Sequence, residues 1–99
     1  MITEIAHLTI DPARADAFEA AVASVADVFR RAKGCHGVAL EREIEDPARY
    51  RLRVDWDSVE AHMVDFRNSP DFQLWRGAAG PFFVTPPEVV HVEAPIRIV

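Results

Sequence analysis

The stretch from Trp56 to Trp75 reads WDSVEAHMVDFRNSPDFQLW and carries the strongest signals in the chain. It begins with an aromatic residue that ends a predicted strand, and Ser58 then provides the N-cap of a helix. Ser69-Pro70 breaks this helix and starts a second one, because serine caps a helix and proline suits its first position. The two predicted helices gather aromatic side chains, one imidazole and guanidinium groups. Such a collection is suited to lining an apolar pocket.

Two segments before this stretch predict a β-hairpin. Apolar residues occupy alternate positions in both segments, namely Val38, Leu40 and Ile44 in the first and Tyr50, Leu52, Val54 and Trp56 in the second. This period of two is typical of strands with one apolar face. With Asp46-Pro47-Ala48 as the loop, the charged faces would pair Glu45 with Arg49, Glu43 with Arg51, and Glu41 with Arg53. These pairs would set the register, on a face that is either solvated or in contact with another subunit.

The remaining segments predict one long helix and two further strands. Residues 2–10 are rich in isoleucine and threonine and indicate the first strand. Asp11-Pro12 then provides a helix start, and Gly34 provides a left-handed stop. Between them runs an apolar stripe of helical period, formed by Phe18, Val22, Val25 and Phe29. Residues 88–93 indicate the last strand.

The order strand, helix, strand, strand, helix, strand predicts an α+β protein with a ferredoxin-like βαββαβ topology. Its antiparallel sheet would carry both helices on one face, because crossover connections are right-handed. Residues 1–99 suffice for one such domain. A sheet with one uncovered face in so short a chain predicts a homodimer, in which a second copy covers that face.

Composition and charge exclude several classes of function. The net charge is −5 and the chain has no basic cluster, so neither nucleic acid nor an anionic membrane is expected as a partner. The single Cys35 cannot form an internal disulfide, which is typical of proteins in the reducing cytoplasm. The N-terminal segment contains Glu4 and His7 and lacks a basic region, so we expect no signal peptide. No apolar run approaches the length of a membrane span.

The motifs in the chain predict no metal and no cofactor. There is no glycine loop for phosphate, no pair of cysteines and no helix with a His-x-x-x-His pattern. The histidines lack the spacing of metal ligands; they are His7, His36, His62 and His91. Cys35 and His36 are adjacent on a predicted strand, so their side chains would point to opposite faces. They are therefore excluded as a nucleophile and its base.

The best candidate for acid–base chemistry is His62, which lies on the first helix of the opening stretch. An imidazole beside a pocket can exchange a proton near neutral pH, although a structural hydrogen bond would also explain a histidine here. Trp56 and Trp75 are candidates for either the core or a substrate platform. Arg67 and Arg76 are either solvated or able to reach a substrate oxyanion.

The same stretch resembles a known family. The chain resembles the antibiotic biosynthesis monooxygenase (ABM) domain family, whose members are dimeric α+β barrel proteins. The clearest motif combines Trp56-x-Ser58-x-Glu60-Ala61-His62 with Phe66-Arg67-x-Ser69-x-x-Phe72-x-x-Trp75. Further matches are Gly37-x-x-Leu40, the segment from Tyr50 to Trp56, and Pro87-x-Val89. The resemblance extends over essentially the whole chain and implies a ferredoxin-like subunit whose sheet packs against that of its twin.

The resemblance also implies an oxidation by O₂ without metal or flavin, because several members oxidise phenols, quinols or anthrones in this way. Such a reaction needs a dry aromatic cavity, a base for the phenolic proton and donors for the oxyanion. By resemblance the cavity residues would be Trp56, Phe66, Phe72 and Trp75. His62 would be the base, and Arg67 or Arg76 would be the donor.

One departure from the family pattern argues against heme degradation. The heme-degrading branch has an asparagine on the first strand, a tryptophan on the second helix and a histidine four residues after the later phenylalanine. This chain has Ala6, Phe66 and Arg76 at those positions, so the axial iron ligand is missing. Two functions stay open: a monooxygenase with a small aromatic substrate, or a non-catalytic ligand-binding or accessory dimer. An imidazole directed into the pocket with a raised or lowered pKa favours the first, and a filled core with His62 on the surface favours the second.

Overall fold

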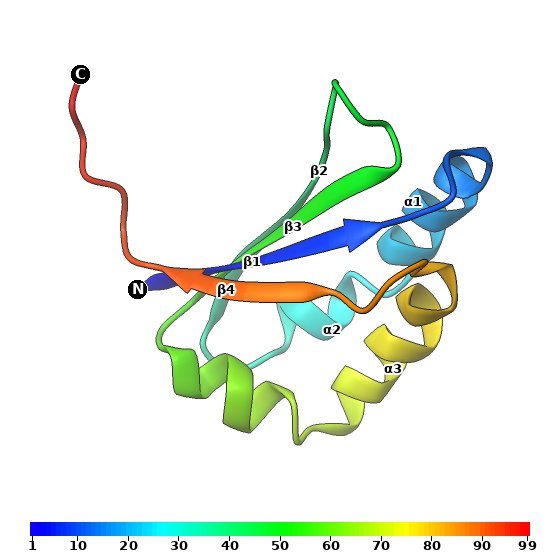
Figure 1. The fold of residues 1–99 in the computed structure, drawn as a ribbon. Coiled ribbons are helices and arrows are strands. Elements are labelled where there is room, and N and C mark those ends of the chain that lie inside the picture. The colour runs from blue at the N-terminus through cyan, green and yellow to red at the C-terminus, as the bar shows by residue number, and fades with distance from the viewer.

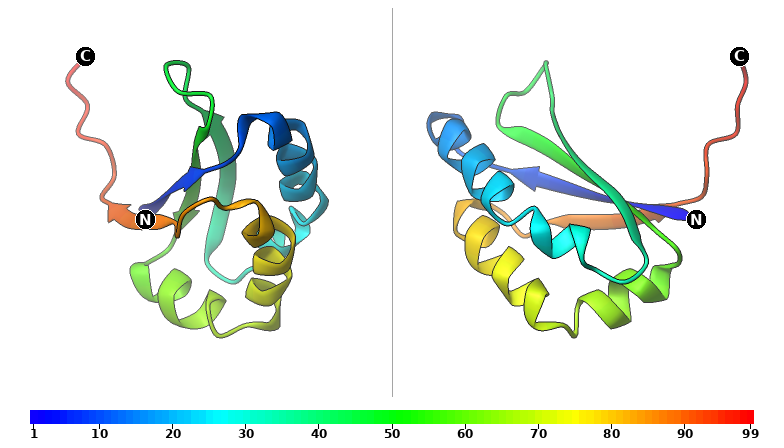
Figure 2. Two further views of the ribbon diagram at one scale, coloured as in Figure 1. Left: turned by 45° about the vertical axis from the view of Figure 1, so that its right-hand side comes forward. Right: turned by 180° about the vertical axis from the view of Figure 1, so that it is seen from behind.

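The computed structural model describes residues 1–99 and shows one antiparallel sheet with the helices on a single face (Figures 1 and 2). The strands are β1 (Ile2–Thr9), β2 (Cys35–Arg42), β3 (Arg49–Trp56) and β4 (Glu88–Val92). The helices are α1 (Ala15–Ser24), α2 (Asp27–Arg30), α3 (Pro70–Ala79), the 3-10 turns η1 (Pro12–Arg14) and η3 (Gly80–Phe82), and the π-helix η2 (Ala61–Phe66). The strand order β2-β3-β1-β4 is that of a ferredoxin-like α+β fold, which confirms the predicted fold class.

The long first helix was predicted as one element, and this prediction is wrong. Asp11 does cap its start, since the carboxylate accepts a hydrogen bond of 3.0 Å from the Ala13 N–H. The helix then ends at Ser24, whose hydroxyl donates to the Ala21 carbonyl at 2.6 Å. Val25 has a φ of −113°, so the chain leaves the helix before α2 begins. A serine that bonds back to the preceding turn, followed by a β-branched residue, explains this break.

The hairpin between β2 and β3 has a different register from the one predicted. Glu41 lies opposite Arg51 rather than Arg53, a shift of two residues. The cause is a turn in which the Asp46 carbonyl accepts from the Arg49 N–H at 2.9 Å, while the Asp46 side chain accepts from the Ala48 N–H at 3.1 Å. Ile44 is left 90% exposed, outside the ladder. Because side chains alternate with period two, the shift keeps Glu41 and Arg51 on the same face, where they form a 3.0 Å ion pair.

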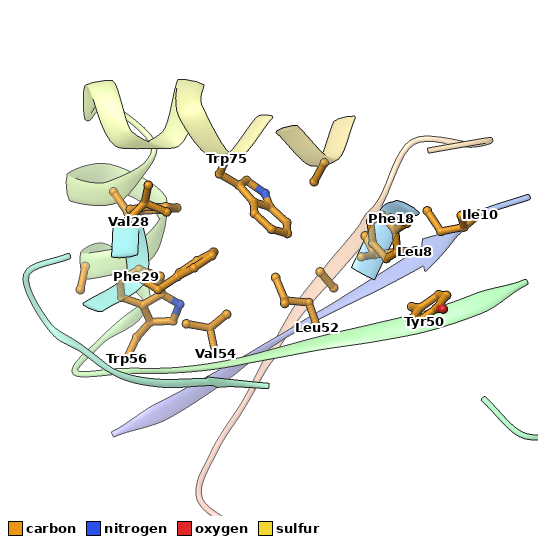
Figure 3. Close-up of a cluster of buried hydrophobic side chains, with 14 of the residues drawn as sticks. Leu8, Ile10, Phe18, Val28, Phe29, Tyr50, Leu52, Val54, Trp56 and Trp75 are labelled. Carbon is orange, nitrogen blue, oxygen red and sulfur yellow. The ribbon is translucent and has the colours of Figure 1, made fainter. Parts of the chain in front are cut away.

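The hydrophobic core lies between the sheet and the helices (Figure 3). Alternate residues of β1 and β3 point into it, and the most deeply buried side chains are Leu8, Ile10, Phe18, Val54 and Trp56. The opposite face of the sheet has no helix over it (Figure 2). Val90 and Val92 on that face are exposed, and so is the tail that follows β4. None of the helices is both long enough and apolar enough to cross a membrane.

Gly34 joins α2 to β2 and brings the start of β2 close to η2. Its φ is +82°, a left-handed conformation that side-chain-bearing residues rarely adopt. A Cβ atom at this position would lie 3.0 Å from the Cβ of Ala61, and the Gly34 carbonyl accepts a 2.8 Å hydrogen bond from the Asp57 N–H. The left-handed conformation predicted for Gly34 is therefore confirmed, although α2 already ends at Arg30, and a close approach adds a second reason for glycine.

Two glycine substitutions should change stability in opposite directions. Gly34→Ala should lower the free energy of unfolding by about 1–2 kcal/mol, because alanine is strained at positive φ. Gly77→Ala should raise it by up to about 1 kcal/mol, because alanine is the better helix former. A Cβ on Gly77, within α3, would meet nothing within 4 Å. Urea unfolding at one fixed protein concentration measures both, and a Gly34→Ala protein as stable as the wild type would contradict the first expectation.

Candidate active site

A cavity of about 670 Å³ opens between the inner face of the sheet and the segment from η2 to β4. More than half of its 17 lining residues are hydrophobic. The cavity brings together all but one of the site residues predicted from the sequence, namely His62, Phe66, Arg67, Phe72, Trp75 and Arg76. A concave space with a largely apolar lining and a few polar groups is the usual form of a small-molecule site.

The π-helix η2 explains why three of these residues share one side. Its start is capped by the Ser58 hydroxyl, which accepts a 3.1 Å hydrogen bond from the Ala61 N–H. The Arg67 N–H donates to the His62 carbonyl at 3.1 Å, five residues earlier, so this helix has more than four residues per turn. Residues four and five positions after His62 therefore both return to its side. These residues are Phe66 and Arg67.

The second helix of the opening stretch supplies an aromatic wall. The Ser69 hydroxyl accepts from the Phe72 N–H at 3.3 Å, and Pro70 occupies the first turn, as predicted. Phe72 meets Phe66 edge to face with ring centroids 5.7 Å apart. Trp75 is buried and meets Phe29 of α2 in the same manner at 5.3 Å. These edge contacts hold the rings upright around the cavity instead of letting them fill it.

Trp56 is the one predicted site residue that does not line the cavity. Its side chain is fully buried behind His62, and the two rings stack with centroids 5.4 Å apart and an interplanar angle of 18°. The indole Nε1 donates a 3.0 Å hydrogen bond to Oε1 of Glu4. Trp56 thus supports the wall of the cavity from within the core.

Two polar neighbours of His62 were missed from the sequence: Glu4, which lines the cavity, and His91, which contacts His62 without lining it. Glu4 Oε1 lies 3.2 Å from His62 Nε2, and His62 Nδ1 lies 2.9 Å from His91 Nε2. Glu4 is only 6% exposed and His62 only 3%. A signal for Glu4 existed, because it occupies a core-facing position in the alternation of β1 with Ala6. No pattern in the short β4 segment indicated on which face of the sheet His91 would lie. In the structure His91 is paired with Glu4 between β4 and β1.

The three groups have pKa values that differ from their ordinary ones. Burial raises the pKa of Glu4 to about 6, against a lowering by the Trp56 hydrogen bond and the charge of Arg67. Burial lowers the pKa of His62 to about 4, with His91 and Arg67 adding to the effect. The pKa of His91 is also lowered, by burial and by Arg67. At neutral pH Glu4 is therefore ionised while both imidazoles are neutral.

The ionised carboxylate selects one tautomer for each imidazole. Because Glu4 can then only accept, the proton of His62 belongs on Nε2, which faces Oε1. Nδ1 of His62 is left as an acceptor, and His91 donates to it from Nε2. The result is a continuous chain of polar contacts from Trp56 through Glu4 and His62 to His91. No group of three or more His, Cys, Asp or Glu side chains is arranged to hold a metal ion.

Comparison with known proteins identifies the family. The family model described as "Antibiotic biosynthesis monooxygenase" matches residues 1–78 of this chain. The chain belongs to the antibiotic biosynthesis monooxygenase family, as the resemblance in its sequence predicted. It is 30% identical to YczJ of Bacillus subtilis strain 168, a protein described as uncharacterized, over 94% of this chain and 98% of that one.

Solved structures agree with this assignment. A Bordetella bronchiseptica protein provisionally described as an antibiotic biosynthesis monooxygenase is 53% identical, with a TM-score of 0.93 over 96% of this chain and 97% of that chain. A mutant of SnoaB, a cofactor-independent oxygenase from Streptomyces nogalater, is 22% identical, with a TM-score of 0.77 over 98% of this chain and 95% of that chain. The second likeness shows a shared fold.

Replacing Glu4 by glutamine should stabilise the protein at neutral pH. The pKa of Glu4 is higher in the folded protein, about 6, than its ordinary value of 4.5, so ionisation opposes folding. The free energy of unfolding of Glu4→Gln should exceed that of the wild type by about 2 kcal/mol at pH 7. The difference should shrink as the pH falls through 6 and vanish below about 4.5, where the carboxyl is protonated in both states.

Denaturant unfolding across this pH range measures the effect. Glu60→Gln, which removes an exposed carboxylate, is the matched control and should stay within about 0.5 kcal/mol of the wild type. A Glu4→Gln protein clearly less stable than the wild type at pH 7 would mean that the carboxylate is a structural requirement.

Proposed function

We propose that this protein is a cofactor-independent monooxygenase that oxidises a small aromatic substrate of the phenol, quinol or anthrone type with O₂. The observation that carries the proposal is one cavity in which an aromatic wall, an imidazole–carboxylate pair and two arginines come together. The likeness to SnoaB, a cofactor-independent oxygenase, and the membership of the family support the same reaction type. In this proposal the protein needs neither metal nor flavin, because the electron-rich ring itself reduces O₂, and it works in the cytoplasm.

Each group has a role in the proposed reaction. His62 and Glu4 form the proton-accepting pair for the substrate hydroxyl, and the resulting anion is electron-rich enough to react with O₂. Arg67 stabilises the oxyanion, and Arg76 contributes to binding near the same cavity. Phe66, Phe72 and Trp75 contact the ring. With an anthrone, the ring CH₂ becomes a carbonyl with one atom of O₂, and the other atom leaves as water.

A non-catalytic ligand-binding role is the alternative for this fold. A surface histidine over a filled core would favour that role. His62 is instead buried beside an open cavity and faces a carboxylate, an arrangement with a use in proton transfer. The geometry therefore supports the enzyme better.

Substituting His62 should slow the chemical step more than it weakens binding. His62→Ala should lower kcat by about 10²-fold or more, the usual effect of losing part of the proton-transfer machinery. Trp75→Ala provides a contrast, because it should mainly raise KM through lost ring contacts that are equal in ground and transition states. Oxygen uptake with a hydroquinone and with an anthrone measures both parameters. Unchanged turnover in the His62 variant would leave the imidazole with a structural role only.

We further propose that the chain acts as a homodimer through the uncovered face of its sheet. Ile5 and Val90 are paired neighbours on that face, and Val90 is 48% exposed. The Glu41–Arg51 ion pair lies on the same face and would fix the orientation of a partner. A second copy would hide the apolar strip while leaving the cavity on the helical side accessible.

The proposed interface should bury roughly 1,000 Å² or more of surface in total. Sedimentation should therefore show a dimer at micromolar concentration. Val90→Glu should shift the protein toward the monomer, because it places a charge in the proposed interface. Val64→Glu is the matched control, since Val64 on η2 is 47% exposed and lies away from that face. A wild-type monomer, or a Val90→Glu protein that dimerises as well as the control, would refute this interface.

A further inference from the structure

Glu4 occupies a position where an apolar side chain would normally be expected. It lies on the inner face of β1, in the same row as Ala6 and Leu8, which belong to the core. A buried carboxylate costs stability unless it is fully paired, and an apolar residue of similar size would avoid that cost. Glu4 is paired on one side only. Oε1 accepts from Trp56 and faces His62.

The second carboxylate oxygen, Oε2, has no hydrogen-bond partner in the protein. Every fully buried side-chain oxygen and nitrogen has such a partner, so Oε2 is not fully buried. Since Glu4 lines the cavity, Oε2 is the atom that a ligand can reach. The two N–H donors at Oε1 hold the carboxylate in place, so this free oxygen is presented in a fixed orientation.

We propose that Glu4 is the catalytic base of this site and takes the proton of the substrate hydroxyl on Oε2. In this step the O–H bond of the ligand breaks, its electron pair stays on the aryl oxygen, and a new O–H bond forms on Glu4. Arg67, from the same cavity, faces the aryl oxyanion. His62 then acts as a positioning residue, because its Nε2–H is directed at Oε1 and both ring nitrogens already have protein neighbours.

The charges around Glu4 agree with this assignment. The titratable groups near it are His62 from η2, Arg67 at the C-terminal end of η2, His91 from β4 and Cys35 from β2. With a pKa of about 6, Glu4 is mostly ionised at neutral pH and is a stronger base than His62, whose pKa is about 4. A base whose pKa lies close to the working pH is the more effective one. The inference rests on the proposed function only for the class of ligand.

The test uses 4-nitrophenol, whose phenolate form is visible by its absorption. At pH 7 the wild-type protein should bind the probe as phenolate without releasing a proton, because Glu4 keeps it. Glu4→Gln should either bind the neutral phenol or release to the buffer the proton of each probe molecule that enters as phenol and is bound as phenolate. Glu60→Gln is the control and should behave like the wild type. Absorption together with calorimetry in buffers of different ionisation enthalpy counts the protons.

Two results would overturn the inference. One is a wild-type protein that binds the neutral phenol. The other is a Glu4→Gln protein that binds phenolate without releasing a proton. If the variant does not fold, a measurement on the wild type alone tests the inference. By ¹³C NMR the Glu4 carboxyl should titrate near pH 6 in the free protein. At pH 7 it should become protonated when the probe binds. A carboxyl that stays ionised in the complex would contradict the proposal.

Oxygen uptake separates this inference from the proposed function. If a hydroquinone or anthrone is oxidised, kcat/KM should fall as the pH drops through about 6, and Glu4→Gln should remove this dependence while lowering kcat by about 10²-fold. A merely structural glutamate would not change the pH profile. Proton transfer to Glu4 without oxygen uptake would refute the monooxygenase alone, and oxygen uptake with an unchanged pH profile in Glu4→Gln would refute the role of Glu4 alone.

Discussion

The burial of one indole ring connects the core of this domain to its polar groups. Trp56 is fully buried at the end of β3, stacked on His62 and 5.3 Å from the ring of Phe66. A buried indole needs an acceptor for its N–H, and Glu4 on the neighbouring strand provides one. The carboxylate then needs further donors, and His62 lies beside it. The packing of the core and the polar end of the cavity are thus parts of the same arrangement.

The aromatic residues that line the cavity contact one another. Phe29 from α2 supports Trp75, and Phe72 supports Phe66, so the rings pack against one another at their edges. The π-helix adds Arg67 to the same side as His62. A site of this kind lowers the stability of a small domain, because it replaces packed side chains by open space and a buried charge. Such a cost is typical of functional sites.

The two faces of the sheet serve different purposes. The inner face carries the core and the cavity, and the outer face carries ion pairs and exposed valines. The two-residue difference in hairpin register left this division intact, since only a shift by an odd number would move side chains to the other face. The register itself depended on the Asp46 turn, whose hydrogen bonds exclude two residues from the ladder.

The amino-acid sequence by itself determined the order of elements, the faces of the strands, the helix start at Ser69 and the family. These follow from local rules: alternation, capping and a motif that spans twenty residues. The same stretch predicted part of the cavity wall, because His62, Phe66, Phe72 and Trp75 are close in the chain as well as in space. Local signals did not show the break after Ser24 or the extra residues in the hairpin, where short-range hydrogen bonds compete with regular structure.

Only the tertiary structure decided which polar groups meet at His62. Glu4 and His91 come from opposite ends of the chain and reach His62 because β1 and β4 are neighbours in the sheet. No residue spacing in the sequence predicts that these two positions are neighbours. The pKa values of Glu4 and His62 likewise depend on burial, which is a property of the folded molecule. The sequence therefore predicted part of the wall of the site, and the fold determined the acid–base properties of Glu4 and His62.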